Sequence, residues 1–410
     1  MVASVLAALV PTGAHGQDAP PAEVAAPVTL VDIGAGVGLP RLTHSWDLVV
    51  GRIDGDGVDD LVVADHDRIQ VYLNRQPGLE PGFTRNMSDP HGCALGDIDD
   101  NTFTDLYCTQ GAEQGNAFGR NRLFLQQAAG VWVEQSEAYG VADLYGRGRR
   151  TTFVDLDHRN GLDLFVGNEV GRTDGQVSAN RTFLAEATPP MTMRRLGPIG
   201  DKGAVCVQAI DQDRDGWQDL LLCGGSNQPG VTHTGSTDRL YLYRNRPGDD
   251  GQRRLVDVAS TLGIAVKGVR SARLARLNGD GIRDLVVVSS NRLAVYPGNG
   301  DHSFDPPTFI RSLSAGNWVA IGDVDGRHGN DLFVVQGCTN SGGNIRDLLL
   351  VHRQGWDYGE VPAPAVGAGC GDTAAMLDLD GDNAQEIVVG NGRWASRGPL
   401  QVLTAGNYRP

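Results

Sequence analysis

Three features are missing from this sequence of 410 residues. No segment shows sustained helical periodicity and no apolar run is long enough for a transmembrane helix, so neither a helical fold nor a membrane span is expected. The Gly-x-Ser-x-Gly, His-Glu-x-x-His and phosphate-binding glycine-loop patterns of common enzymes are absent. Basic residues number 35 against 50 acids, and the net charge of −15 argues against nucleic acid or an anionic membrane as a partner.

The most informative stretch runs from Asp211 to Asp219 and carries acids at positions one, three, five and nine. Alternate residues of an extended turn point the same way, so these carboxylates converge and repel one another unless a cation lies between them. Oxygen-only ligands in a variable, multidentate arrangement suit Ca²⁺ better than Mg²⁺. Gly216 permits the bend, but the Glu at position twelve and the second helix of an EF-hand are missing. We therefore predict a calcium loop between two strands.

The same pattern occurs seven times and forms an internal repeat. Each copy ends in an acid that is followed by Leu or Ile and an apolar run. Loops one to seven, in chain order, span residues 52–60, 97–105, 155–163, 211–219, 276–284, 323–331 and 378–386. Because the copies keep one register over most of the chain, chance does not explain them.

Each repeat also contains signals for four short strands. One strand precedes the loop and the apolar run follows it. An alternating segment such as Ile69–Leu73 comes next, and a fourth segment such as Val131–Val133 completes most units. Four short strands per unit at this spacing are typical of a propeller blade. The sequence therefore predicts an all-β fold, a seven-bladed β-propeller over residues 28–410.

The seventh repeat has no segment for a fourth strand after Leu400–Leu403. Near the N-terminus, however, Thr29–Leu39 is similar to the fourth-strand segment Arg254–Ile264. We expect this N-terminal strand to complete the last blade and to close the ring, which removes the exposed edges of an open array. An open solenoid is the alternative.

The pattern Asp-x-Asp-x-Asp-Gly-x-x-Asp-Leu, with Gly before Asp97 and Asp323, resembles the FG-GAP/VCBS repeats of integrin α-subunit propellers and their bacterial relatives. The stretches Gly92–Asp97 and Leu255–Ile264 resemble the cartilage-acidic-protein (ASPIC/UnbV-associated) branch. The resemblance covers residues 28–410. It implies Ca²⁺ in the loops between strands and a role in adhesion or ligand binding, without naming a ligand.

Three loops have every ligand position filled, and we expect calcium in each of them. Their ligands are the side chains of positions one, three, five and nine and the carbonyl of position seven. They are Asp97, Asp99, Asn101, Phe103 and Asp105 in loop two, Asp211, Asp213, Asp215, Trp217 and Asp219 in loop four, and Asp378, Asp380, Asp382, Ala384 and Glu386 in loop seven.

The other four loops carry Arg in a ligand position: Arg52, Arg159, Arg276 and Arg327. Their remaining ligand residues are Asp54, Asp56, Asp60, Asp155, Asp157, Asp163, Asn278, Asp280, Asp284, Asp323, Asp325 and Asp331. Either the guanidinium lies among these carboxylates and replaces the charge of the ion, or it points to solvent and leaves a weaker calcium site. Three bound ions per chain would favour the first alternative, and seven would refute it. In both cases the loops are structural, since binding stabilises the strands that they join.

Six cysteines are present, and four of them flank loops two and four almost symmetrically. This places Cys93 with Cys108, and Cys206 with Cys223, on opposed strands of one hairpin, where a disulfide is possible. Cys338 and Cys370 then pair by elimination. Free buried cysteines are the alternative, but the even count and the N-terminus favour an oxidising compartment.

The N-terminus has the features of a signal peptide. An apolar run over residues 2–10 leads to small residues near Ala14–Gly16, so residues 1–16 are expected to be removed and residues 17–27, rich in Pro and Ala, to form a linker. A frayed apolar terminus is the alternative, because a positive leading region is missing. The basic residues include only two lysines, which indicates GC-rich codon usage and a bacterial origin. We therefore expect an extracellular or periplasmic protein.

Two functions remain open. The first is a monomeric binding or adhesion module for an extracellular protein or glycan, with structural Ca²⁺. The second is an enzyme on the same scaffold, such as a polysaccharide lyase, with His, Tyr and Arg gathered from several blades. A His–Tyr–Arg cluster at the mouth of the ring would favour the enzyme, and a flat or aromatic-lined face would favour binding. We prefer binding, because the fold does not imply catalysis and no catalytic signature is present.

Overall fold

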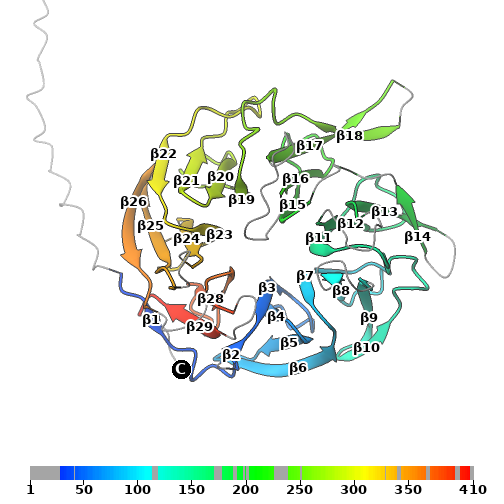
Figure 1. Ribbon diagram of the computed structural model, residues 1–410, viewed down its shortest axis with the longest axis horizontal. Helices are drawn as coiled ribbons and strands as arrows, with labels where there is room; N and C mark the ends of the chain where they lie inside the picture. The colour runs from blue at the N-terminus through cyan, green and yellow to red at the C-terminus, as the bar shows by residue number, and fades with distance from the viewer. Residues whose placement is uncertain are drawn as a thin grey trace, which may run out of the picture.

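The chain forms a closed ring of seven antiparallel sheets (Figure 1). The computed structural model describes residues 28–40, 42–112, 119–169, 178–187, 192–196, 199, 203–225, 239–249, 252–327, 329–338, 343–365, 370–392 and 398–406. The seven-bladed β-propeller predicted from the repeats is confirmed. None of these residues lies in an α-helix, so no apolar helix of membrane-spanning length occurs among them. The expected signal peptide and linker lie outside the described residues.

Each blade runs from an innermost strand at the ring axis to an outer strand (Figure 1). Blade one has β3 (Ser45–Gly51), β4 (Asp60–Asp65), β5 (Arg68–Asn74) and β6 (Leu79–Asn86), and blade two has β7 (Pro90–Gly96), β8 (Asp105–Gln110), β9 (Arg122–Ala128) and β10 (Val131–Glu134). Blade three has β11 (Gly148–Val154), β12 (Asp163–Asn168), β13 (Arg181–Glu186) and β14 (Thr192–Leu196), and blade four has β15 (Cys206–Ile210), β16 (Asp219–Cys223), β17 (Leu240–Pro247) and β18 (Arg253–Asp257).

Blades five and six repeat this order. Blade five has β19 (Val269–Ala275), β20 (Asp284–Ser289), β21 (Arg292–Tyr296) and β22 (Phe309–Ser312). Blade six has β23 (Gly316–Gly322), β24 (Asp331–Gln336), β25 (Leu348–Gln354) and β26 (Asp357–Pro362). Blade seven takes β27 (Thr373–Leu377), β28 (Glu386–Gly390) and β29 (Gly398–Thr404) from the end of the chain.

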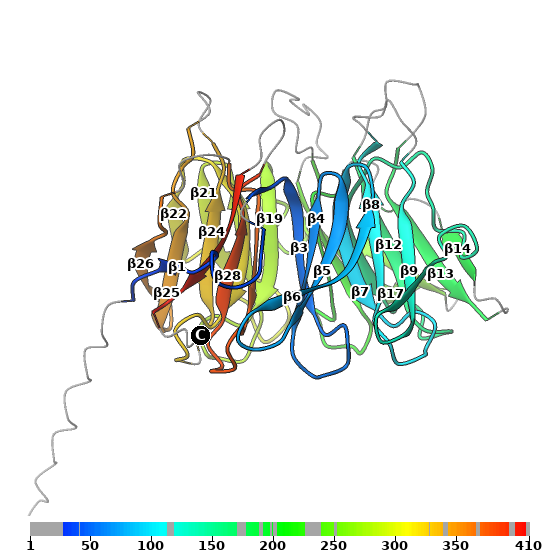
Figure 2. The same ribbon diagram turned by 90° about the horizontal axis from the view of Figure 1, so that it is seen from below.

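The N-terminal strand completes blade seven, as the sequence predicts. Strand β1 (Val31–Asp32) pairs antiparallel with β29, with Val31 opposite Thr404. The backbone N–H of Ile33 extends the ladder by donating to Val402 O at 2.8 Å. Strand β2 (Leu42–Thr43) pairs with the other end of β29. The first and last described segments thus lie side by side and close the ring (Figures 1 and 2).

The core lies between neighbouring blades, and the second strand of each blade occupies its centre. Every residue of β4, β12, β16, β24 and β28 is buried. A strand that is covered on both faces reads as a continuous apolar run rather than an alternation, which is why an unbroken run follows each acidic loop. The outer strand β18 instead alternates between partly buried and exposed residues. The sequence pattern within each repeat therefore follows the distance from the ring axis.

Three disulfides connect the six cysteines in the predicted pairs. Cys93 lies opposite Cys108 in the pairing of β7 with β8, and Cys206 lies opposite Cys223 in the pairing of β15 with β16. The third bond joins Cys338, after β24, to Cys370, before β27, and so links blades six and seven. Bonds that close loops of this size stabilise a fold by about 3 kcal/mol each.

Candidate metal centres

The seven acidic loops all join the innermost strand of a blade to its second strand. Because the innermost strands lie side by side around the axis, the loops share one end of the ring, which we call the loop end. The end of the axis where the innermost strands begin is called the start end. The loop end therefore gathers the acidic positions of the sequence into one layer.

In five loops the acids at positions one, three and nine converge. One oxygen of each lies within 4.8 Å of the other two. These clusters comprise Asp97, Asp99 and Asp105; Asp155, Asp157 and Asp163; Asp211, Asp213 and Asp219; Asp323, Asp325 and Asp331; and Asp378, Asp380 and Glu386. Loops two, four and seven, which the sequence singles out for calcium, are among them. Loops three and six join them in spite of their arginines.

The donor chemistry of the clusters fits a hard cation. Asp99 Oδ1 and Asp213 Oδ1 are buried and have no hydrogen-bond partner. A buried carboxylate oxygen without a donor is costly, and a cation among the three acids would satisfy it. The position-three acid of loop six differs, because Asp325 Oδ2 lacks a hydrogen bond but lies 3.3 Å from the Arg327 guanidinium. The clusters can therefore hold a metal ion, and an oxygen-only donor set is consistent with Ca²⁺.

Position five has a different local role from the one expected. Asp215 Oδ1 accepts a hydrogen bond from Trp217 N at 2.9 Å, and Asp382 Oδ1 accepts one from Ala384 N at 2.8 Å. Asn101 Oδ1 does the same for Phe103 N at 2.8 Å. These bonds hold the turn, and neither Asp215 nor Asp382 belongs to a three-acid cluster. Ligation by the position-five side chains and by the position-seven carbonyls remains a prediction.

The ninth acid of each loop ties the loop to the blade. Asp219 Oδ2 accepts a hydrogen bond from Gln212 N at 2.9 Å, and its Oδ1 accepts one from Asn245 N in β17 at 2.8 Å. The ninth acids of five other loops accept the same two hydrogen bonds. One comes from the backbone N–H at position two of the loop, and the other from a backbone N–H in the segment on the far side of the second strand. These acids are Asp60, Asp105, Asp163, Asp284 and Asp331. Glu386 accepts from Leu379 N at 2.9 Å.

Sequence reasoning treated this acid only as a ligand and missed its structural role. A signal was present, because position two is apolar in all loops except loop four. These buried side chains, which hold the donating N–H groups in place, are Ile53, Ile98, Leu156, Leu277, Val324 and Leu379. The ninth acid therefore combines a structural contact with a place in the cluster.

Burial and charge act together on these acids. Burial raises the pKa of Asp105, Asp163 and Asp331 to about 7, although backbone hydrogen bonds lower it and neighbouring loop carboxylates raise it further. The pKa of Glu386 rises to about 7 and that of Asp219 to about 6 for the same reasons. Full ionisation of a cluster is therefore unfavourable without a cation.

The arginines of loops one and three do not replace an ion. Arg52 lies 3.6 Å from Asp59, which is not a ligand position. A different arginine, Arg75 at the end of β5, lies 2.5 Å from Asp54 and 2.9 Å from Asp56. In loop three Arg159 is exposed and makes no ion pair with a described carboxylate. The guanidinium hypothesis thus fits loop one, but through a residue outside the loop.

The arginines of loops five and six also differ from each other. Arg327 lies 3.3 Å from Asp325 Oδ2, with its side chain 49% exposed. Arg276 has no ion pair with Asp280 or Asp284 and lines a cavity at the ring axis instead. Among the described residues, loops one and five form no three-acid cluster. This leaves loops two, three, four, six and seven as candidate metal centres.

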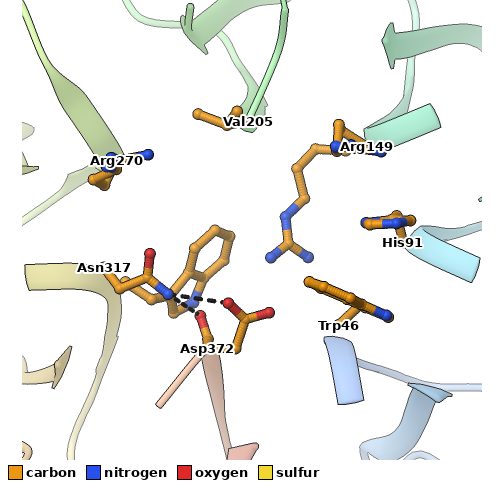
Figure 3. Close-up of a pocket in the computed structure, with 9 residues that line it drawn as sticks. Trp46, His91, Arg149, Val205, Arg270, Asn317 and Asp372 are labelled. Carbon is orange, nitrogen blue, oxygen red and sulfur yellow. Dashed lines mark hydrogen bonds between the residues drawn. The ribbon is translucent and has the colours of Figure 1, made fainter. Parts of the chain in front are cut away.

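The start end of the axis carries a small cavity of about 20 Å³, enough for about one water molecule (Figure 3). Residues at or just before the innermost strands of all seven blades line it, among them His91 and Asn317. Two of its polar groups have charged partners: Arg149 pairs with Glu169, which lies outside the lining, and Asn317 Nδ2 donates to Asp372 Oδ1 at 3.1 Å. Among the described residues its lining includes His and Arg but no Tyr, so these residues do not assemble there the His–Tyr–Arg cluster that would favour an enzyme.

Comparison with known protein families identifies two segments of the chain. An FG-GAP-like repeat matches residues 52–108 and residues 276–334. The first segment contains loops one and two, and the second contains loops five and six. No curated protein matches the chain significantly. The matched repeats agree with the seven blades of the ring.

Proposed function

We propose that this chain, an FG-GAP repeat β-propeller, is a secreted calcium-binding module that recognises or adheres to an extracellular protein or glycan. Calcium binding is supported by the convergence of three acid oxygens within 4.8 Å of one another in each of five loops. The FG-GAP-like repeats on a closed propeller support the binding part. Within this family we place the chain in the cartilage-acidic-protein branch, on the motifs described above.

Calcium has a structural role in this proposal. Positions one and three belong to the loop, whereas position nine is the first residue of the second strand. An ion held by all three therefore joins the loop to the strand that lies in the centre of the blade. Ligands that bind only the folded state stabilise it by mass action. A dissociation constant for calcium on the order of 10⁻⁴–10⁻³ M suits an extracellular module.

The cysteines and the N-terminal sequence support the export part of the proposal. All six cysteines are in disulfides, which persist in oxidising compartments and are rare in the cytosol. We assign residues 1–16 to a signal peptide and residues 17–27 to a linker, and we expect the mature protein to be monomeric.

A glycan array and a panel of extracellular proteins, probed with and without chelator, test the function. We expect binding in millimolar calcium that is lost with chelator and weakened in Asp213→Asn. The matched control is Asp357→Asn, an exposed acid outside the loops whose side chain is 60% exposed. Binding that is equally strong in chelator would contradict the role of calcium, and binding to neither panel would contradict the proposed function.

A further inference from the structure

A second and larger cavity, of about 450 Å³, lies at the loop end of the axis. Blades four, five and six line it through Gln208 of β15, Arg273–Ala275 of β19, Ile321 of β23, and the loop residues Arg276, Arg283 and Asn330. Its volume falls within the range of small-molecule pockets, whereas the start-end cavity holds about one water molecule.

The lining of this loop-end cavity includes three arginines and no acid. Within the described part of the chain, Arg273, Arg276 and Arg283 have no carboxylate within ion-pair distance. At the start end, by contrast, Arg149 pairs with Glu169 and Arg150 pairs with Asp47. Three arginines without a described ion pair therefore line one cavity of a protein whose net charge is −15.

The direct contacts of Arg273 and Arg283 are with an aromatic ring and backbone carbonyls, and the Arg276 side chain is exposed. Arg273 lies over the ring of Trp318 at 4.5 Å and donates to Ala272 O at 2.9 Å. Arg283 donates to the backbone carbonyl of Asp211. The backbone carbonyl of Arg276 accepts a hydrogen bond from Asn330 Nδ2 at 2.7 Å, and the Arg276 side chain is exposed.

Burial and like charges act on the same groups. Burial and the neighbouring Arg150 lower the pKa of Arg273 to about 10, although Asp47 raises it. Burial, Arg276 and Arg214 lower the pKa of Arg283, although Asp211 raises it. Like charge thus acts between Arg276 and Arg283 in this cavity, and a bound anion would relieve that repulsion. Guanidinium groups pair with planar or tetrahedral oxyanions through two hydrogen bonds at once.

We propose that the loop-end cavity binds a small ligand through an oxyanion group, a carboxylate, sulfate or phosphate, held by Arg273, Arg276 and Arg283. Leu274, Ala275 and Ile321 add apolar side chains to the lining for the carbon body of the ligand. The inference deepens the proposed binding function and rests on it, because it names the chemistry that the ring recognises. It also explains why Arg276 replaces an acid at position one of loop five.

To test this, the calcium-loaded protein is titrated with sulfate, inorganic phosphate, D-glucuronate and neutral D-glucose. Binding is measured by calorimetry and by tryptophan fluorescence. Trp318, which stacks with Arg273, makes fluorescence a local reporter. Arg276→Gln is the test variant, because its exposed side chain supports no other described contact. Arg353→Gln is the matched control, since its side chain is 65% exposed and lies away from the cavity.

We expect saturable binding of at least one anion, no binding of glucose, at least a tenfold loss of affinity in Arg276→Gln and none in Arg353→Gln. The anion that binds identifies which oxyanion the ligand carries. No saturable binding of any anion, or equal affinities for the two variants, would overturn the proposal. The thermal stabilisation by calcium is measured on the same samples, so that failure of this inference is distinguished from failure of the calcium role.

Discussion

Asp219 accepts a hydrogen bond at 2.8 Å from the backbone N–H of Asn245, which lies 26 residues further along the chain and in a different strand of the blade. Equivalent contacts occur at Asp60 and Asp284, although loops one and five form no described acid cluster. The ninth acid therefore supports the blade whether or not a metal is bound. Metal binding is an additional property of the loops that also keep acids at positions one and three.

This structural role predicts a metal-independent loss of stability in loop five. Asp284→Asn puts an amide N–H₂ against one of two backbone donors, at Leu277 and Gly298. We expect it to lower the free energy of unfolding by about 1–3 kcal/mol, equally with calcium and with chelator. Denaturant unfolding measures this, with Asp357→Asn, at an exposed acid outside the loops, as the control. A loss seen only in calcium would show that Asp284 acts as a ligand.

Loop three offers a gain-of-affinity prediction. Its acids converge, and Arg159 occupies position five without an ion pair to a described acid. Arg159→Asp adds a carboxylate where loops four and seven carry one, so we expect about a tenfold rise in the calcium affinity of one site. Competition with a calcium indicator dye measures it. Arg353→Asp makes the same charge change away from the loops, and an equal rise in that variant would mean that net charge alone is responsible.

A pH-dependent prediction concerns Asp347, outside the metal centres. Burial raises its pKa to about 7, although the Gln336 backbone N–H, which donates to Oδ1 at 2.7 Å, lowers it. The folded state then holds a proton that the unfolded state has lost between about pH 4 and pH 7. Its contribution to stability is complete below that window, falls as pH rises through it, and is lost above it.

Asparagine already makes the equivalent contact in two other blades: Asn121 Oδ1 accepts from Gln110 N, and Asn180 Oδ1 accepts from Asn168 N. We therefore expect Asp347→Asn to stabilise the protein by roughly 1–3 kcal/mol at pH 8 and to change little at pH 4. Thermal unfolding at both pH values checks this. A variant that is less stable than the parent at pH 8 would mean that Asp347 is favourably ionised in the fold.

The repeat was sufficient to predict the seven blades because each acidic loop precedes a run that is buried on both faces. Leu220 and its neighbours in β16 are apolar without alternation since adjacent blades cover both sides. Ring closure was predictable because Val31 belongs to a segment similar to a fourth strand found elsewhere in the chain. The disulfide partners of loops two and four followed from their symmetric placement, which is a property of hairpin register.

What could not be predicted depends on contacts between distant segments. Arg75 follows the third strand of blade one, and only folding places its guanidinium beside Asp54. The loop-end cavity has the same cause, because Gln208, Arg276 and Ile321 come from three different blades. The sequence of a loop predicts its turn and its acids. The charged residues that other segments place around the loop depend on the assembly of the ring.

The number of calcium ions bound per chain tests the central claim most directly. Protein freed of metal by chelation is dialysed against millimolar calcium, and bound calcium is counted by elemental analysis together with calorimetric titration. The account predicts five ions, in loops two, three, four, six and seven, where three acid oxygens converge. Retention of no calcium would contradict it, and so would seven ions, because loops one and five would then bind without a cluster.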